Sequence, residues 1–252
     1  MWTINRFVLY FITWMIVCFM QFGCHGTDEN ASRNEKASVP EFELNLAKKL
    51  NFPDSGMYIQ DHRDEQIYRI VKIGTQLWMA ENLNFSSEGS WCYRDSSVYC
   101  EKRGRLYNWK AAKEACPKGW RLPSNDDWSM LREYVIFNSR EGCPSRRCPP
   151  RSCRCAGYKL KKNSGWQRAV DVPAGSDEFG FSGVPGGMRM LDGSFGGLND
   201  HSYLWSATEA DSVRSFVWDL WYNANVFYES FEQKKGKDGN KNNAFSVRCI
   251  KD

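Results

Sequence analysis

The sequence predicts an α+β domain with two helices near its front and a large antiparallel sheet in its C-terminal part. Each helix has a start signal ahead of an apolar stripe, which is the pattern of an amphipathic helix. The C-terminal part consists of short aromatic and β-branched runs separated by turn residues, as expected for strands. Residues 57–252 are numerous enough to bury a substantial core as one domain.

The first predicted helix begins after Asn108, whose side chain can accept a hydrogen bond from the helix N-terminus. Trp109, Ala112 and Cys116 recur on one face of this helix. Pro117 ends it, because proline has no amide hydrogen to donate.

The second predicted helix begins after Ser124, with Asp127 three residues later in the position of a capping box. Trp128, Leu131 and Val135 then form an apolar stripe, so we expect this face to pack against the core.

Strands are predicted on both sides of the helices. The segments are 57–59, 67–73, 77–79, 203–208, 215–220, 226–231 and 244–250. The last four are predicted to form a β-meander, with a turn at 223–225 between the second and third of them. A glycine-rich stretch, 180–197, lacks the spacing of a phosphate-binding loop, so we expect a tightly turned loop there.

The N-terminal 23 residues are predicted to be a signal peptide. Arg6 supplies a short basic region, and the uncharged segment 7–22 is shorter than the roughly 20 residues of a membrane span. Cys24 follows Gly23 in the position of a lipoprotein cysteine, so we expect Cys24 to be lipidated. An uncut membrane anchor and ordinary signal cleavage are the alternatives. Residues 24–56 are predicted to be a polar tether.

The cysteines indicate an oxidising compartment. Cys92 and Cys100 flank a short polar loop and are most simply a local disulfide. An apparent insertion at about 138–156 carries four more cysteines: Cys143, Cys148, Cys153 and Cys155. We expect these four to pair among themselves, since their spacing lacks the Cys-x-x-Cys units of a zinc site.

Composition and motifs exclude several function classes. The formal net charge of +4 is too small to indicate a nucleic-acid-binding protein, and no nucleic-acid-binding motif accompanies it. The chain has three histidines: His25 in the tether, His62 in a predicted turn, and His201 beside Asp200. Sequence neighbours in a loop do not make a catalytic triad. We therefore expect no enzyme, no metal site and no cofactor.

The segment 116–128, Cys-Pro-Lys-Gly-Trp-Arg-Leu-Pro-Ser-x-x-x-Trp, resembles the signature of the Fibrobacter succinogenes major paralogous domain. The segments 67–74, 78–84, 156–161 and 245–250 agree with this family in order. These bacterial surface domains are in turn similar to C-type-lectin-like domains and to the formylglycine-generating-enzyme type of domain. The resemblance therefore implies a C-type-lectin-like fold, with the two helices packed on a twisted antiparallel sheet that carries long loops.

Further expectations come from the resemblance alone. In lectin-like folds a disulfide joins the first helix to the last strand, which implies a Cys116–Cys249 bridge. Family members usually have glycine where this chain has Glu65, which leaves the geometry of that turn open. Formylglycine-generating enzymes work through a late, copper-binding cysteine pair, but this chain has no cysteine between Cys155 and Cys249. The calcium-binding motifs of true C-type lectins are also absent from the sequence.

These observations favour a non-catalytic lipoprotein of the bacterial cell envelope, in the outer membrane or at the cell surface, that acts as a binding or adhesion module. Its expected partners are the membrane, through the lipid anchor, and a polysaccharide or surface-protein ligand. A structural envelope protein that contacts other proteins is the alternative, and a formylglycine-generating-like enzyme ranks last. The candidate ligand-binding residues are Trp218, Trp221, Tyr222 and Tyr228. Aromatic residues are also common in protein cores, so the alternative is that most of these side chains are buried.

Overall fold

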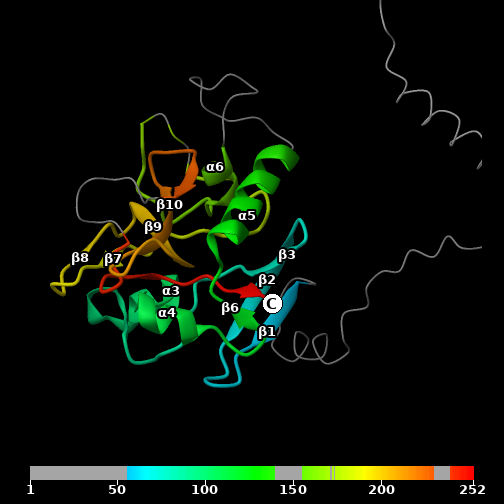
Figure 1. Cartoon of the computed structure of the whole chain (residues 1–252). Coiled ribbons are helices and arrows are strands. Elements are labelled where there is room, and N and C mark those ends of the chain that lie inside the picture. The colour runs from blue at the N-terminus through cyan, green and yellow to red at the C-terminus, as the bar shows by residue number, and fades with distance from the viewer. Residues whose placement is uncertain (1–55, 140–154, 171, 173, 230–238) are drawn as a thin grey trace, which may run out of the picture. The chain divides into compact units, whose positions relative to one another are not determined.

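The computed structural model describes residues 56–139, 155–170, 172, 174–229 and 239–252 (Figure 1). The predicted signal peptide, Cys24, nearly all of the tether and most of the cysteine-rich insertion lie outside these residues. Within the described part, helices and strands are mixed, and nearly all strand pairs are antiparallel, which confirms the α+β class. None of the described helices has the length and apolar content that a membrane span requires.

The smaller sheet combines the first strands of the domain with its C-terminal strand. Its strand order is β1 (Met57–Gln60), β2 (Ile67–Ile73), β3 (Gln76–Met79), β13 (Ile250–Lys251) and β6 (Trp120–Arg121). The C-terminal strand β13 thus lies between β3 and β6, and β6 belongs to the segment that connects the two predicted helices (Figure 1).

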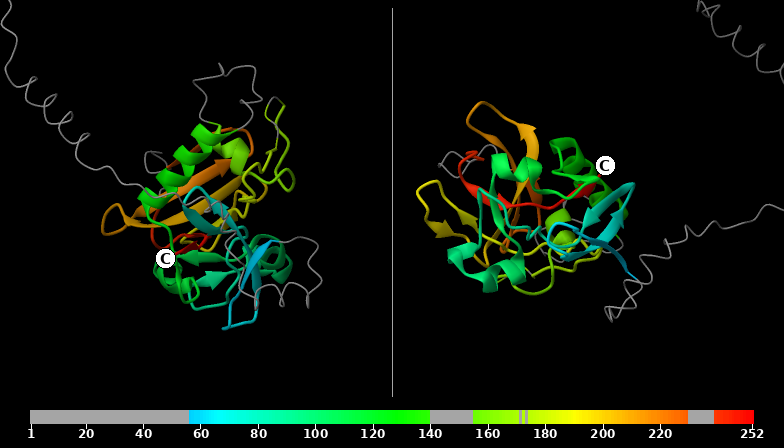
Figure 2. Two further views of the ribbon diagram at one scale, coloured as in Figure 1. Left: turned by 90° about the vertical axis from the view of Figure 1, so that its right-hand side faces the viewer. Right: turned by 90° about the horizontal axis from the view of Figure 1, so that it is seen from below.

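The larger sheet has the order β11 (Phe227–Glu229), β10 (Ser215–Trp221), β9 (His201–Glu209), β12 (Ala244–Ser246), β5 (Leu106–Asn108) and β4 (Ser90–Trp91). Two short strands, β7 (Met188–Arg189) and β8 (Phe195–Gly196), form a hairpin that attaches to β12. In Figure 2 the strands β1, β2 and β3, in blue and cyan, belong to a different sheet from β9 and β10, in yellow to orange.

The predicted four-strand meander is only partly correct. β9, β10 and β11 form an antiparallel meander, but β12 pairs with β9 in parallel. The predicted strand 244–250 is divided into β12 and β13, which belong to different sheets. Between these two strands, the carbonyls of Val247 and Cys249 accept hydrogen bonds from Leu83 and Met79. This last segment therefore holds the two sheets together.

Both predicted helices form, with the predicted caps. In α4 (Trp109–Ala115) the Asn108 side chain accepts a hydrogen bond from the Ala111 amide. The buried face of α4 is Trp109, Ala112 and Ala115, whereas Cys116 lies just beyond the helix end. The other described helices are α3 (Ser97–Arg103), α6 (Ala156–Leu160) and a 3-10 turn at Tyr93–Asp95. The sequence analysis treated the region of α3 as a loop.

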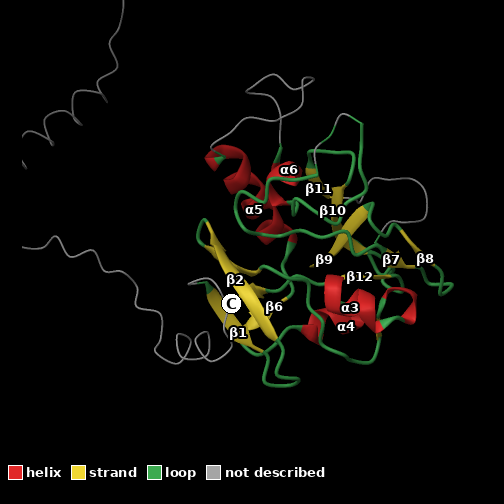
Figure 3. Ribbon diagram, turned by 180° about the vertical axis from the view of Figure 1, so that it is seen from behind, coloured by secondary structure: helices red, strands yellow, loops and turns green. Residues whose placement is uncertain are grey.

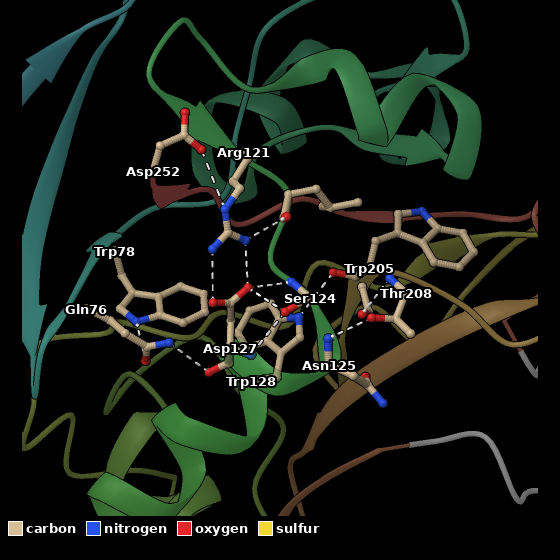
Figure 4. A network of polar contacts seen from close by, with 12 residues as sticks. Gln76, Trp78, Arg121, Ser124, Asn125, Asp127, Trp128, Trp205, Thr208 and Asp252 are labelled. Carbon is tan, nitrogen blue, oxygen red and sulfur yellow. Dashed lines mark hydrogen bonds and ion pairs between the residues drawn. The ribbon is translucent and has the colours of Figure 1, made fainter.

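The second predicted helix, α5 (Asn125–Asn138), is fixed at its start by a polar network (Figure 4). Arg121 donates two hydrogen bonds to the Asp127 carboxylate, at 2.6 and 3.1 Å. The same carboxylate accepts from the amide and hydroxyl of Ser124, both at 2.7 Å, which completes the capping box. The Gln76 amide donates to the Asp127 carbonyl and accepts from the Trp78 indole. The signature segment thus ties α5 to both β3 and β6.

The predicted stripe on α5 packs against strands of both sheets. Trp128, Leu131 and Val135 are fully buried. The Trp128 ring lies 4.7 Å from the ring of Trp78 and 6.4 Å from that of Trp218. Burial of such large rings provides most of the driving force for this interface.

Two disulfides are formed as predicted, Cys92–Cys100 and Cys116–Cys249. The second spans 133 residues, so its constraint on the unfolded chain is worth on the order of 5 kcal/mol. Cys155 is also disulfide-bonded. Cys143, Cys148 and Cys153 lie outside the described residues.

The turn between β1 and β2 contains one residue, Glu65, in a backbone conformation that favours glycine. Glu65 has φ +60°, in the left-handed region, and its amide donates to the Asp61 carbonyl at 2.7 Å. His62 lies exposed in the same turn. Glu65 therefore adopts the left-handed conformation that glycine would favour.

Arg248, between β12 and β13, is a fully buried cation. Its guanidinium donates to Asn82 Oδ1 at 2.7 and 3.2 Å, to the Met79 carbonyl at 3.2 Å and to the Phe181 carbonyl. It also lies 4.4 Å from the centre of the Phe181 ring. Burial lowers the pKa of Arg248 to about 10, so the side chain stays charged at neutral pH.

We predict that Arg248→Met lowers the free energy of unfolding by about 3 kcal/mol or more, because several buried acceptors lose their donors at once. Urea denaturation measures this, with the exposed Lys118→Met as the control that removes a surface cation. Equal stabilities of the two variants would contradict a structural role for the Arg248 network.

Candidate functional site

The predicted aromatic candidates lie on two sides of the β9–β10–β11 sheet. Trp218 faces α5, is fully buried, and its indole donates to Asn125 Oδ1 at 2.7 Å. Phe227, next in the sequence to Tyr228, is 2 % exposed on the same side. Trp218 is therefore a core residue, and its predicted place in the ligand-binding surface has to be corrected. Its side chain cannot reach a ligand, because α5 covers that face of the strand.

The opposite side of the sheet carries a second group of polar and aromatic side chains. Strand register places Asp219 opposite Tyr203 on β9 and Tyr228 on β11, and Trp221 opposite His201. Alternate residues of a strand face the same side, so these five side chains share one face. We call His201, Tyr203, Asp219, Trp221 and Tyr228 the aromatic face.

The rings of the aromatic face contact one another. The His201 ring is parallel to that of Tyr203, with the centroids 4.9 Å apart. Trp221 meets His201 edge-on at 4.7 Å and Tyr228 edge-on at 5.9 Å. Tyr203 is buried, whereas His201, Trp221 and Tyr228 are partly exposed. The three partly exposed rings form the accessible part of the face.

Asp219 is the polar centre of this face. Its side chain is 2 % exposed, and Oδ2 lies 3.3 Å from His201 Nδ1 and accepts a hydrogen bond from the Trp221 indole. The other carboxylate oxygen, Oδ1, is buried and has no hydrogen-bond partner among the described residues. Burial raises the pKa of the Asp219 carboxyl to about 6, although His201 and Trp221 act to lower it. Burial also raises the pKa of the Tyr203 and Tyr228 hydroxyls, so both stay neutral.

Tyr222 follows Trp221 but leaves the strand toward the other side. Its side chain is partly exposed and packs against the core cluster that contains Trp218 and Leu220. Its amide donates to the Asp200 carbonyl at 2.9 Å. Trp221 and Tyr222, adjacent in the sequence, are therefore not parts of one stacking surface.

The β10–β11 turn is supported by the segment that contains α6, which lies beside β11 (Figure 3). The buried Lys161 ammonium donates to the carbonyls of Trp221, at 2.8 Å, and Ala224, at 2.9 Å. Burial lowers the pKa of Lys161 to about 8, so most of this ammonium remains charged at pH 7. A Cβ atom on Gly157 would lie 2.2 Å from the Val226 carbonyl oxygen, so only glycine lets the turn approach α6 so closely. The hairpin that carries Trp221 is consequently rigid.

In the described strands, no serine is adjacent to His201 and Asp219 on their face of the sheet. Ser202 neighbours His201, but it lies on the opposite face of the strand, so His201 and Asp219 do not form a triad with it. Among the residues that the structure describes, no three His, Cys, Asp or Glu side chains lie close enough together to hold a metal ion. In the sequence His201 lies near Asp200, whereas in the fold its carboxylate partner is Asp219, which the sequence alone did not indicate. Strand register, which pairs residues 203 and 219, is the signal that links them.

We predict that Asp219→Asn changes the pH dependence of stability. The wild-type carboxyl has a pKa near 6 when folded, above the ordinary 3.8. Between pH 6 and 4 the folded state therefore binds a proton that the unfolded state does not, so wild-type stability falls as pH rises through this window. Above pH 6 the buried charge costs on the order of 3 kcal/mol. Asparagine avoids this cost and can still hydrogen-bond to His201 and Trp221.

The measurement is urea denaturation at pH 4.5 and pH 7.5. Relative to wild type, Asp219→Asn is expected to gain stability from the lower to the higher pH, whereas the exposed Asp95→Asn control is not. Parallel pH profiles of Asp219→Asn and wild type would show that the carboxyl is not perturbed.

Comparison with known protein families finds one match, in which residues 71–251 fit the model of the Fibrobacter succinogenes major domain. No curated protein and no solved structure matches the chain. The family match spans most of the chain, including the α5 capping network, the segment around Gly157 and Lys161, and Arg248. The chain therefore belongs to the Fibrobacter succinogenes major domain family.

Proposed function

We propose that this protein is a non-catalytic binding module that holds a polysaccharide against the aromatic face. The observation that carries this proposal is the group of partly exposed rings, Trp221, Tyr228 and His201, around the buried carboxyl of Asp219. Sugar rings present apolar C–H faces that stack on aromatic rings, and hydroxyls that hydrogen-bond to polar groups at the edge.

Rigidity of the β10–β11 hairpin supports this proposal. Lys161 and Gly157 fix the turn, and Asp219 fixes the orientation of the Trp221 indole. A ligand that stacks on a fixed ring loses its own conformational freedom, but no free energy is needed to order the protein side chain. Even a few weak contacts can then give useful affinity, particularly on a repetitive polymer to which many copies bind.

The same proposal includes a C-type-lectin-like arrangement and a place in the bacterial cell envelope. It takes the mature protein to be a lipoprotein anchored through Cys24, with residues 24–56 as the tether. Intact-mass analysis of the membrane fraction tests the anchor. The expected mature chain starts at Cys24 and carries the mass of the lipid, and a chain that retains Met1 would contradict this.

A second candidate function is protein–protein contact as a structural envelope component. It is favoured by an apolar stripe on the outer side of α5, where Met130, Tyr134 and Phe137 are 51 %, 38 % and 82 % exposed. Apolar side chains at this spacing form one face of a helix, and exposed apolar faces often mark protein contacts.

We predict that Trp221→Ala and Tyr228→Ala each weaken binding to insoluble cellulose, chitin or xylan at least about fivefold, because loss of a stacking contact costs on the order of 1 kcal/mol or more. Tyr134→Ala, on the α5 stripe, is the control that removes an exposed ring elsewhere. Sedimentation with each polysaccharide measures the bound fraction, and the thermal transition of each variant verifies folding.

Two outcomes would contradict the proposal. One is retention of binding by the folded Trp221→Ala and Tyr228→Ala variants. The other is loss of binding in Tyr134→Ala, which would favour the α5 stripe instead. If Trp221→Ala unfolds, quenching of wild-type tryptophan fluorescence by soluble fragments of the bound polymer tests the same contact.

A further inference from the structure

A groove runs along α3, on a part of the molecule that the proposed polysaccharide site does not use. It consists of two hollows of about 390 and 450 Å³. Both are lined by Gln66, Asn84, Cys100 and Glu101, so they lie side by side. We call this combined hollow the α3 groove. Its volume is sufficient for several sugar units in a row.

Basic side chains are in excess along the α3 groove. Three acidic side chains line it, against six basic ones: Arg63, Arg69, Lys102, Arg103, Arg105 and Lys162. Arg63 and Arg69 have carboxylate partners, Asp61 and Glu81. The other four form no ion pair with a carboxylate of the described residues. A concave surface with this charge raises the local concentration of anions.

Arg103 is fixed in position while its charge remains uncompensated. Its guanidinium donates to the Pro185 carbonyl at 2.7 Å and to Asn199 Oδ1 at 2.6 Å. Both partners are neutral. Lys102, from the same helix, and Lys162, from the segment after α6, are exposed. The groove therefore combines a cation that hydrogen bonds hold in place with two exposed ones.

A further positive charge lies beneath the groove. Asn82 lines the groove, and its Oδ1 accepts the hydrogen bonds of the buried Arg248. No carboxylate among the described residues lies within ion-pair distance of Arg248, although Glu81, which lines the groove, and Asp177 raise its pKa from further away. A buried charge without a directly paired counter-ion is costly, and an anion that binds nearby reduces that cost. Arg248 thus adds a buried positive charge to those of the surface lysines, partly offset by Glu81 and Asp177.

We propose that the α3 groove binds an acidic glycan, a polymer whose sugar units carry carboxylate groups. The basic side chains pair with the carboxylates, and the amide and hydroxyl groups of the lining bond to the sugar hydroxyls. The Asn84 side chain, which lines both hollows, is partly exposed, and its amide group can bond to a sugar hydroxyl. The length and polar lining of the groove favour a glycan over an acidic peptide, which would need apolar pockets for its side chains.

The test uses the full-length protein and isothermal titration with a tetramer of galacturonate. The comparison ligand is the fully methyl-esterified tetramer, which has the same chain without the charges. We expect the charged tetramer to bind and the ester to bind at least about tenfold more weakly. Affinity for the charged tetramer should also fall as the salt concentration is raised from 50 to about 500 mM.

Lys102→Glu/Lys162→Glu is the variant, and Lys72→Glu/Lys118→Glu is the control with the same change of net charge at exposed lysines outside the groove. Loss of affinity of at least about tenfold in the first and little change in the second would support the site. Equal loss in both would mean non-specific attraction and overturn the proposal. Equally tight binding of the ester, of a glutamate tetrapeptide or of free phosphate would overturn the assignment to an acidic glycan.

This site and the aromatic face can be tested separately. Trp221→Ala is expected to leave the affinity for the galacturonate tetramer unchanged, and the lysine variant is expected to leave retention on neutral polysaccharide unchanged. Loss of tetramer binding in a folded Trp221→Ala variant would show that the acidic glycan binds at the aromatic face instead of the α3 groove.

Discussion

The buried guanidinium of Arg248 is the interaction on which the arrangement of the two sheets depends. It lies between β12, in the larger sheet, and β13, in the smaller one, and donates to Asn82, to the end of β3 and to the segment at Phe181. Four hydrogen bonds to three neutral acceptor atoms, together with one aromatic ring, replace the water that this cation loses on folding. The short strand β13 alone could not fix the relative position of the sheets, because it makes few ladder pairs. The Cys116–Cys249 disulfide, one residue later, secures the same junction covalently.

The segments that mark the family have structural roles. Asn82 and Arg248 join the sheets, Arg121 and Asp127 fix the start of α5, and Gly157 and Lys161 support the β10–β11 turn. These residues lie far apart in the sequence and each satisfies buried polar groups or permits a close backbone approach. Such roles explain why a fold can be recognised from its motifs while the motifs themselves reveal no ligand. The two proposed recognition surfaces, the aromatic face and the α3 groove, are surfaces that this scaffold holds in place.

Local signals in the sequence predicted local structure well. The caps at Asn108 and Ser124 and the stripe on α5 depend on neighbours within one or two helical turns, so they could be read directly. Features that depend on contacts between distant segments could not be read from the sequence. Positions 218 and 221 point to opposite faces of a strand, but which face is buried depends on where α5 lies, and the sequence does not state that. The parallel β12–β9 pair and the His201–Asp219 contact likewise depend on strand order and register between distant segments.

The central claim is that the scaffold tryptophans are inaccessible and that Trp221 is the indole at the ligand surface. The most direct test is a proton–nitrogen correlation spectrum of the indole groups during titration with the soluble fragments of a polysaccharide that the protein retains. The account predicts that the Trp221 indole signal shifts with saturation, while those of Trp78, Trp128, Trp205 and Trp218 stay in place. Shifts confined to the buried indoles, or saturable binding with no shift at Trp221, would contradict it.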